Sequence, residues 1–225
     1  MLNVSRPWSV RNLFFCLSLI ASVSASTAHA QAPQTEWDRQ LDRLELGATA
    51  IGIITPGVSG TNTLNPPNQM HITQDGSTTV GVLGTLRYTK SPLIGLEGNY
   101  SFARYTENFS AYIIGGAQTR VNEYSLGWVF HLPNLFTTQP YVSLGAGTTA
   151  FHPTGGGGQG LPFQYRATYY YNVGLDKALF GSKSFGARIA MREVFFKAPD
   201  FGQNYLTINQ HATTFEPSLG FYLKF

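Results

Sequence analysis

The sequence contains little charge, one cysteine and no apolar run long enough for a membrane-spanning helix. Charged residues make up 12% of its 225 residues, whereas aromatic residues reach 14%. This composition excludes a disordered chain, because disorder requires low hydrophobicity and high charge. A single cysteine excludes a disulfide scaffold. The net charge of +3 is too small to indicate a nucleic-acid partner.

Residues 1–30 have the three parts of a secretory signal peptide. Two arginines precede an apolar run over residues 13–23, and Ala-His-Ala at 28–30 forms a small-x-small cleavage site. The run is too short to span a membrane as a helix. Cys16 lies inside the run rather than directly after the cleavage site, which excludes a lipoprotein. We therefore expect cleavage and export from the cytoplasm; the alternative is an N-terminal helix that stays in the fold.

Residues 31–43 are polar and carry the densest charge in the chain, and they are expected to form a short periplasmic segment. Beyond them no stretch shows sustained helical periodicity, and apolar residues alternate with polar ones. Alternation is typical of strands, and runs of 11 to 14 residues can cross a bilayer when tilted. The sequence predicts eight strands, at residues 44–54, 78–89, 93–104, 120–131, 140–151, 164–177, 184–195 and 212–225.

The two faces of these strands differ in chemistry. One face is apolar and aromatic, as in Tyr124, Leu126, Trp128 and Phe130. A soluble, lipocalin-like barrel would turn this face inward. The signal peptide, the strand lengths and a balanced set of charges on the other face favour a membrane barrel with its apolar face outward. The opposite face carries five acidic and five basic residues, which are Glu45, Arg87, Glu97, Glu123, Arg166, Asp176, Arg188, Arg192, Glu216 and Lys224.

These ten charges are expected to pair in a network inside the lumen, because unpaired buried charge is costly. Arg188 and Glu97 are the preferred central members. Two residues conflict with the alternation. Glu193 falls on the apolar face, which places it at the outer rim or after a bulge, and Pro217 predicts a bulge because it lacks an N–H group.

Long and short connectors alternate between the expected strands. The long ones cover residues 55–77, 105–119, 152–163 and 196–211 and are rich in Gly, Pro, Asn, Gln and Thr. Membrane barrels with an even number of strands place short turns in the periplasm and long loops outside the cell. The same arrangement is therefore expected here.

The C-terminal octapeptide reads polar-x-Gly-x-x-apolar-x-Phe. This string resembles the assembly signal of bacterial outer-membrane barrels, carried here by Ser218, Gly220, Phe221, Leu223 and Phe225. With eight alternating strands, the chain resembles the small outer-membrane β-barrel superfamily, which includes the barrel of outer membrane protein A and the opacity-type adhesins. The resemblance implies an all-β, eight-stranded antiparallel up-and-down transmembrane barrel over residues 44–225. It also implies contact with the barrel-insertion machinery, and no peptidoglycan-binding domain is expected after Phe225.

Several sequence motifs resemble those of enzymes and cofactor-binding proteins, but each lacks the neighbouring elements or residues that the function needs. Residues 155–160 match the glycine pattern of a dinucleotide-binding loop, but a strand rather than a helix is expected after them. Residues 37–46 are a poor candidate for the amphipathic helix of the outer-membrane palmitoyl transferases. No two histidines outside the expected signal peptide have the spacing of metal ligands. None of them is followed, two residues later, by the serine that the lipid A deacylase would need. These histidines are His71, His131, His152 and His211.

We therefore expect no catalytic, cofactor or metal site. The expected function is structural or adhesive, exerted by the extracellular loops of a monomer in the bacterial outer membrane. Eight strands enclose a space that side chains just fill, which favours a plugged lumen. The alternatives are a narrow channel for small solutes and, less favoured, a lipid-modifying enzyme. Expected partners are outer-membrane lipids and lipopolysaccharide, the insertion machinery and a ligand at the loops, with no nucleic acid.

Overall fold

The computed structural model describes residues 35–110, 115–182 and 184–225. The expected signal peptide, residues 1–30, lies outside these ranges and stays a prediction. The chain divides into two compact units, one ending at Arg39 and the other running from there to the C-terminus.

A short helix, α2 (Glu36–Leu41), occupies part of the charged segment and buries none of its residues. It begins with a reciprocal cap. The Asp38 N–H donates to Thr35 Oγ1 over 3.2 Å, and the Thr35 N–H donates to Asp38 Oδ2 over 2.8 Å. Within the described residues, no helix is both long and apolar enough to span a membrane.

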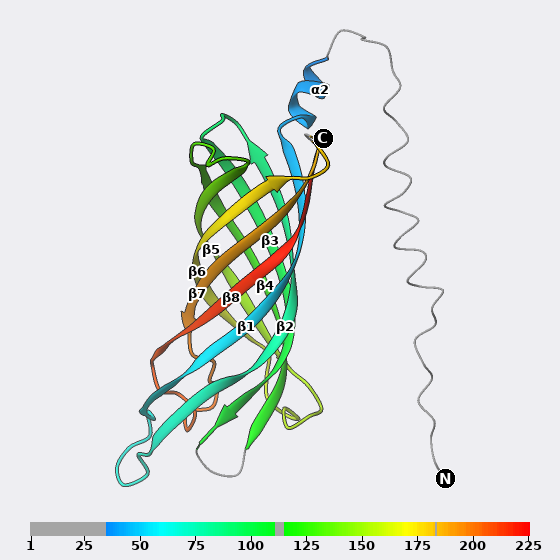
Figure 1. Ribbon diagram of the computed structural model, residues 1–225. Coiled ribbons are helices and arrows are strands. Elements are labelled where there is room, and N and C mark those ends of the chain that lie inside the picture. The colour runs from blue at the N-terminus through cyan, green and yellow to red at the C-terminus, as the bar shows by residue number, and fades with distance from the viewer. Residues whose placement is uncertain (1–34, 111–114, 183) are drawn as a thin grey trace, which may run out of the picture. The chain divides into compact units, whose positions relative to one another are not determined.

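The second unit is a closed antiparallel barrel, in which each strand pairs with its sequence neighbours and the last pairs with the first (Figure 1). The fold class and the strand number are therefore as predicted. The strands are β1 (Leu44–Thr61), β2 (His71–Thr89), β3 (Ile94–Phe109), β4 (Gly116–His131), β5 (Thr138–Pro153), β6 (Gln164–Ala178), β7 (Phe185–Lys197) and β8 (His211–Lys224).

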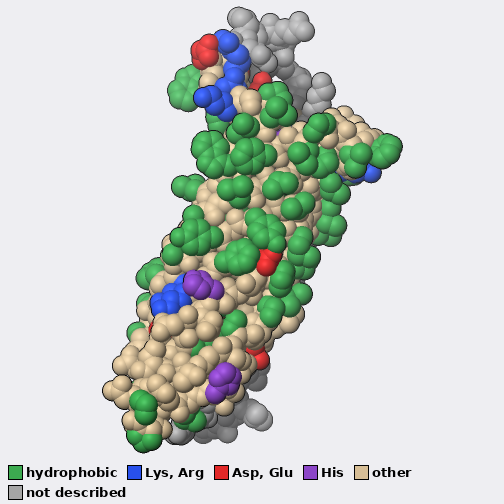
Figure 2. Space-filling model, turned by 90° about the vertical axis from the view of Figure 1, so that its left-hand side faces the viewer, with side chains coloured by type: hydrophobic (Ala, Val, Ile, Leu, Met, Phe, Trp, Pro, Cys, Tyr) green, Lys and Arg blue, Asp and Glu red, His purple; other side chains and the backbone are tan. Residues whose placement is uncertain are grey.

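The barrel wall is apolar outside and filled inside. Along β4 the buried residues Glu123 and Ser125 alternate with Tyr124 and Leu126, and Leu126 is 74% exposed. Figure 2 shows hydrophobic side chains over the wall from the end with short turns to past the middle, whereas the end with long loops is mostly polar and uncharged. An apolar surface this large needs lipid around it. The predicted assignment of the two faces is thus correct.

The strands are longer than predicted, mostly at the end with long loops. The region 55–77, predicted to be a loop, instead extends β1 and β2 and leaves only residues 62–70 between them. Past the apolar belt the outward residues become polar, as in Thr73 and Asp75 of β2, so the apolar outward face no longer marks the strand. The short connectors at 90–93, 132–137 and 179–184 lie at the other end, where the last strand also ends.

The two conflicting residues lie in regular register, so the bulges expected near them are absent. Pro217 lies where the ladder between β1 and β8 is interrupted, but Ile51 pairs with Ser218 and Ile54 with Phe215 in one unbroken register. The proline ring packs on Gly52, where a Cβ would lie 3.3 Å from Cγ. Glu193 does face outward, and its carboxylate accepts a hydrogen bond from the Tyr171 hydroxyl on the neighbouring strand.

Candidate functional site: the barrel lumen

The lumen is filled by three successive layers of side chains. The first layer lies nearest the short turns and consists of Glu45, Arg87, Glu97, Asp176 and Arg188, all at most 4% exposed. Arg188 binds both oxygens of Asp176, through Nε and Nη2, over 2.7 Å each, and its Nη2 also contacts Glu45. Arg87 binds Glu97 over 2.9 Å and Asp176 over 3.3 Å. Shared carboxylates thus join the two arginines into one network.

Tyrosine rings stack against these guanidinium groups. The Arg87 guanidinium lies 4.4 Å from the centre of the Tyr141 ring, and that of Arg188 lies 5.2 Å from Tyr141 and 5.3 Å from Tyr222. A cation over an aromatic face is attracted by the ring quadrupole, most strongly away from water. The rings therefore complete the packing of the first layer without adding charge.

The second layer consists of Glu123, Arg192 and Glu216. Arg192 donates to Glu216 over 2.7 Å and binds both carboxylate oxygens of Glu123. Tyr170 connects the first two layers, since its ring lies 4.4 Å from the Arg192 guanidinium and its hydroxyl donates to Glu97 over 3.0 Å.

Glycines opposite the buried tyrosines make room for their rings. Tyr141 is paired with Gly174, and Tyr222 with Gly186, on neighbouring strands. A Cβ at Gly174 would lie 2.5 Å from the Tyr141 ring, and one at Gly186 would overlap Tyr222. The space left by these glycines is thus occupied by aromatic rings and not by water.

The third layer, nearest the long loops, is mostly apolar, with the buried pair of Gln74 and Glu107 beside it. Residues 198–210, between β7 and β8, place Phe201 and Leu206 in contact with this layer, at 0% and 1% exposure. Phe201 meets Phe109 edge to face at 6.3 Å between ring centres. The wall contributes Ile53, Ala103, Tyr105, Val121, Phe151, Val194 and Phe196 to the layer.

Asp200 fixes the loop 198–210 above the third layer. Its carboxylate pairs with Arg166 over 2.9 Å, accepts from Gln164 over 2.6 Å and accepts from Thr207 over 3.1 Å. Burial acts to raise the pKa of the Asp200 carboxyl, but its hydrogen bonds with Gln164 and the Gly202 N–H and the charge of Arg166 outweigh burial. The pKa therefore lies below its usual value.

Little space is left between the layers. A cavity of about 20 Å³ lies between the second and third layers, lined by Ser101, Glu123, Thr214 and apolar side chains. That volume holds about one water molecule.

The predicted luminal residues divide among these layers. Eight of the ten occur in the first two layers, and Lys224 lies at the edge of the first, with Nζ 3.7 Å from Glu45 Oε2. Arg166 instead pairs with the loop. The preferred central members, Arg188 and Glu97, both lie in the first layer, where Glu97 pairs with Arg87, and Arg188 pairs with Asp176 and Glu45. Strand register fixes neighbours in the wall, whereas contacts across a lumen depend on side-chain reach.

Sequence reasoning missed several residues of the plug. Tyr141, Tyr170 and Tyr222 occur on the polar face, each opposite a glycine, and that pairing was a usable signal. Glu107, which accepts from Gln74 over 3.4 Å, and Asp200 lay in regions predicted to be loops.

The structure also shows where the other motifs considered in the sequence lie. Residues 155–160 lie in the connection between β5 and β6, and a strand follows them. Among the described residues, no group of three or more potential ligands could hold a metal ion. In the C-terminal string, Ser218 and Gly220 face the lumen, while Phe221, Leu223 and Phe225 face outward. Its role in assembly stays a prediction.

Solved structures with this architecture include small barrel proteins of bacteria. The outer membrane protein OprG of Pseudomonas aeruginosa superposes with a TM-score of 0.60 at 15% identity, over 81% of this chain and 95% of that chain. Neisserial surface protein A superposes with a TM-score of 0.54 at 13% identity, over 81% of this chain and 97% of that chain. This chain has the fold of a small outer-membrane β-barrel. No family model and no curated protein sequence matches it.

This fold and the apolar belt together indicate the bacterial outer membrane as the location. In outer-membrane barrels the short turns face the periplasm and the long loops face the exterior. The first layer lies at the end with short turns, which such barrels place in the periplasm, and the third layer lies beneath the long loops.

Removal of Arg87 should strongly destabilise the barrel. Arg87→Ala leaves three buried carboxylates with fewer cations, so we expect a loss of about 3–5 kcal/mol in the free energy of unfolding. Lys224→Ala, at a half-exposed position, serves as a control and should cost about 0–1 kcal/mol. Urea unfolding in lipid vesicles measures both changes, and equal losses for the two variants would contradict a buried network.

Proposed function

We propose that the protein is a sealed, non-enzymatic outer-membrane barrel with a structural or adhesive role exerted by its extracellular loops. The observation that carries this proposal is the three-layer plug. Ions that enter from the periplasm meet Arg87 and Arg188, then Arg192, and finally a closely packed layer in which apolar side chains surround the hydrogen-bonded pair of Gln74 and Glu107.

The loops at the extracellular end expose many of their residues and are held to one another by hydrogen bonds. The loop 198–210 is bound to the hairpin of β1 and β2: Thr63 donates to the Asn204 carbonyl over 3.2 Å, and Asn62 donates to that of Tyr205 over 3.4 Å. Residues 62–70 and 154–163 contain no charged residue. Loops on a rigid scaffold commonly carry recognition, and here amide, hydroxyl and aromatic groups would supply it.

A narrow channel for small solutes is the second candidate, favoured only by the small cavity beside Glu123. Planar-bilayer conductance separates the two functions. The inserted protein should pass no steady ion current, and Arg192→Ala should also stay silent, because the first and third layers still close the lumen. A steady current through the wild-type barrel would establish the channel and overturn the plug.

The loops can be tested on whole cells. Cells that display the protein should adhere to immobilised matrix proteins, and replacing residues 64–69 and 159–163 with Gly-Ser segments should remove that adhesion. The replaced residues lie outside the strands, so the barrel should still assemble and retain its heat-dependent gel mobility. Adhesion that survives both replacements would refute a role for these loops.

A further inference from the structure

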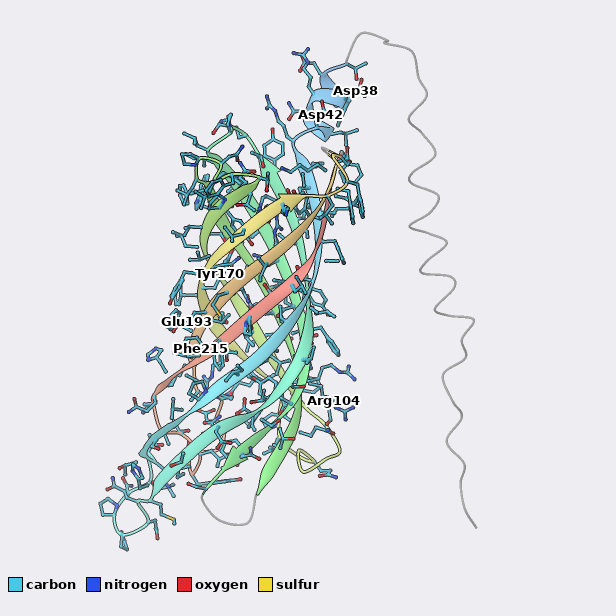
Figure 3. The ribbon with its side chains drawn as sticks, viewed as in Figure 1. Asp38, Asp42, Arg104, Tyr170, Glu193 and Phe215 are labelled. Atoms are coloured by element: carbon cyan, nitrogen blue, oxygen red, sulfur yellow. The ribbon has the colours of Figure 1, made fainter. Side chains whose placement is uncertain are left out.

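Two arginines face each other on the outer surface of the barrel. Arg104 in β3 is the direct cross-strand partner of Arg120 in β4, and both side chains are exposed. Figure 3 shows Arg104 pointing away from the barrel wall. Arg120 is in turn paired with His152 in β5. Three basic residues, two arginines and one histidine, therefore form one row across three adjacent strands.

This row has no acidic partner in the protein. Among the described residues, no carboxylate oxygen lies within 4 Å of either guanidinium group, and the ranges outside them contain neither Asp nor Glu. Arg104 donates only to neutral groups, Gln118 Oε1 over 2.6 Å and Thr154 Oγ1 over 3.4 Å. Like charges directly opposite on paired strands are destabilising. An anion from outside the chain would relieve that repulsion.

The row lies at the outer edge of the aromatic part of the belt. The next outward-facing pair toward the periplasm is Phe102 with Asn122, followed by Tyr100 with Tyr124, whose rings lie 5.2 Å apart. Two strand residues span about 7 Å. The guanidinium groups therefore lie where aromatic side chains give way to polar ones, at the level of lipid headgroups.

An irregularity in the wall holds Arg104 in place. The ladder between β2 and β3 is interrupted between Gly76 and Val82. Side-chain hydroxyls replace the missing bonds: Thr79 donates to the Arg104 carbonyl over 3.1 Å, and Ser77 accepts from the Thr106 N–H over 2.9 Å. Such irregularities often re-aim a side chain at a functional site.

We infer that Arg104 and Arg120, with His152 beside them, bind a phosphate group carried by a glycolipid of the outer leaflet. Guanidinium groups match phosphate in charge and in paired hydrogen-bond geometry. The acyl chains of such a lipid would extend toward the periplasm over Phe102, Tyr100 and the belt below them. The ring of His152, which lies 4.5 Å from the Phe163 ring, would border the headgroup. This site is independent of the plug and of the loop function proposed above.

The test counts lipids bound to the folded chain by native mass spectrometry from detergent micelles. The probes are bisphosphorylated lipid A, the same lipid without phosphates, and inorganic phosphate as a competitor. The variant is Arg104→Gln with Arg120→Gln. The control is Lys90→Gln with Lys177→Gln, which removes two exposed positive charges near the periplasmic turns. Heat-dependent gel mobility must match the wild type for both.

The wild type and the control should bind phosphorylated lipid A alike. Each arginine near an anionic surface contributes about fivefold in affinity, so the double variant should bind roughly twenty- to thirtyfold more weakly. The lipid without phosphates should bind the wild type as weakly as the variant binds the phosphorylated form. Equal affinity of wild type and variant would overturn the site, and full displacement of the lipid by inorganic phosphate would overturn its assignment to a lipid.

Discussion

The narrow lumen is the constraint on which the rest of the structure depends. A closed wall of eight strands leaves no room for bulk water, so the inward side chains away from the two rims are buried. Charge can persist there only where it is neutralised and hydrogen-bonded. Asp176 illustrates the result, since both of its oxygens accept from Arg188 while Arg87 approaches from another strand. The network holds side chains of five strands in fixed positions.

The same constraint explains the glycines and the apolar third layer. Rings as large as those of Tyr141 and Tyr222 fit only where the paired residue has no side chain. Beneath the loops the wall offers few charges, and Phe201 and Leu206 fill the space with apolar volume. The two ion-pair layers hold side chains in fixed positions in the membrane region, and the third layer closes the extracellular end.

The sequence predicted the eight strands, the two faces and the set of inward charges, because alternation is strict wherever one face meets lipid. It did not predict where β1 and β2 end, since the outward face turns polar beyond the membrane while inward residues such as Ile72 stay buried. It named Arg188 and Glu97 as members of one network but not the partner of each, because distances across a lumen follow from tilt and side-chain reach. Asp200 was missed for a third reason: no local pattern shows that a loop residue returns to meet Arg166.

Thiol accessibility inside the lumen tests the sealed barrel most directly. Cys16 is the only native cysteine and lies in the expected signal peptide, so one introduced thiol reports alone. Ser101→Cys places that thiol in the small cavity between the second and third layers, and Asn65→Cys places it in an exposed loop. In the folded barrel, a charged methanethiosulfonate reagent should modify Asn65→Cys promptly and Ser101→Cys only after unfolding. Modification of both at similar rates would show that water and ions reach the lumen, and would contradict the plug.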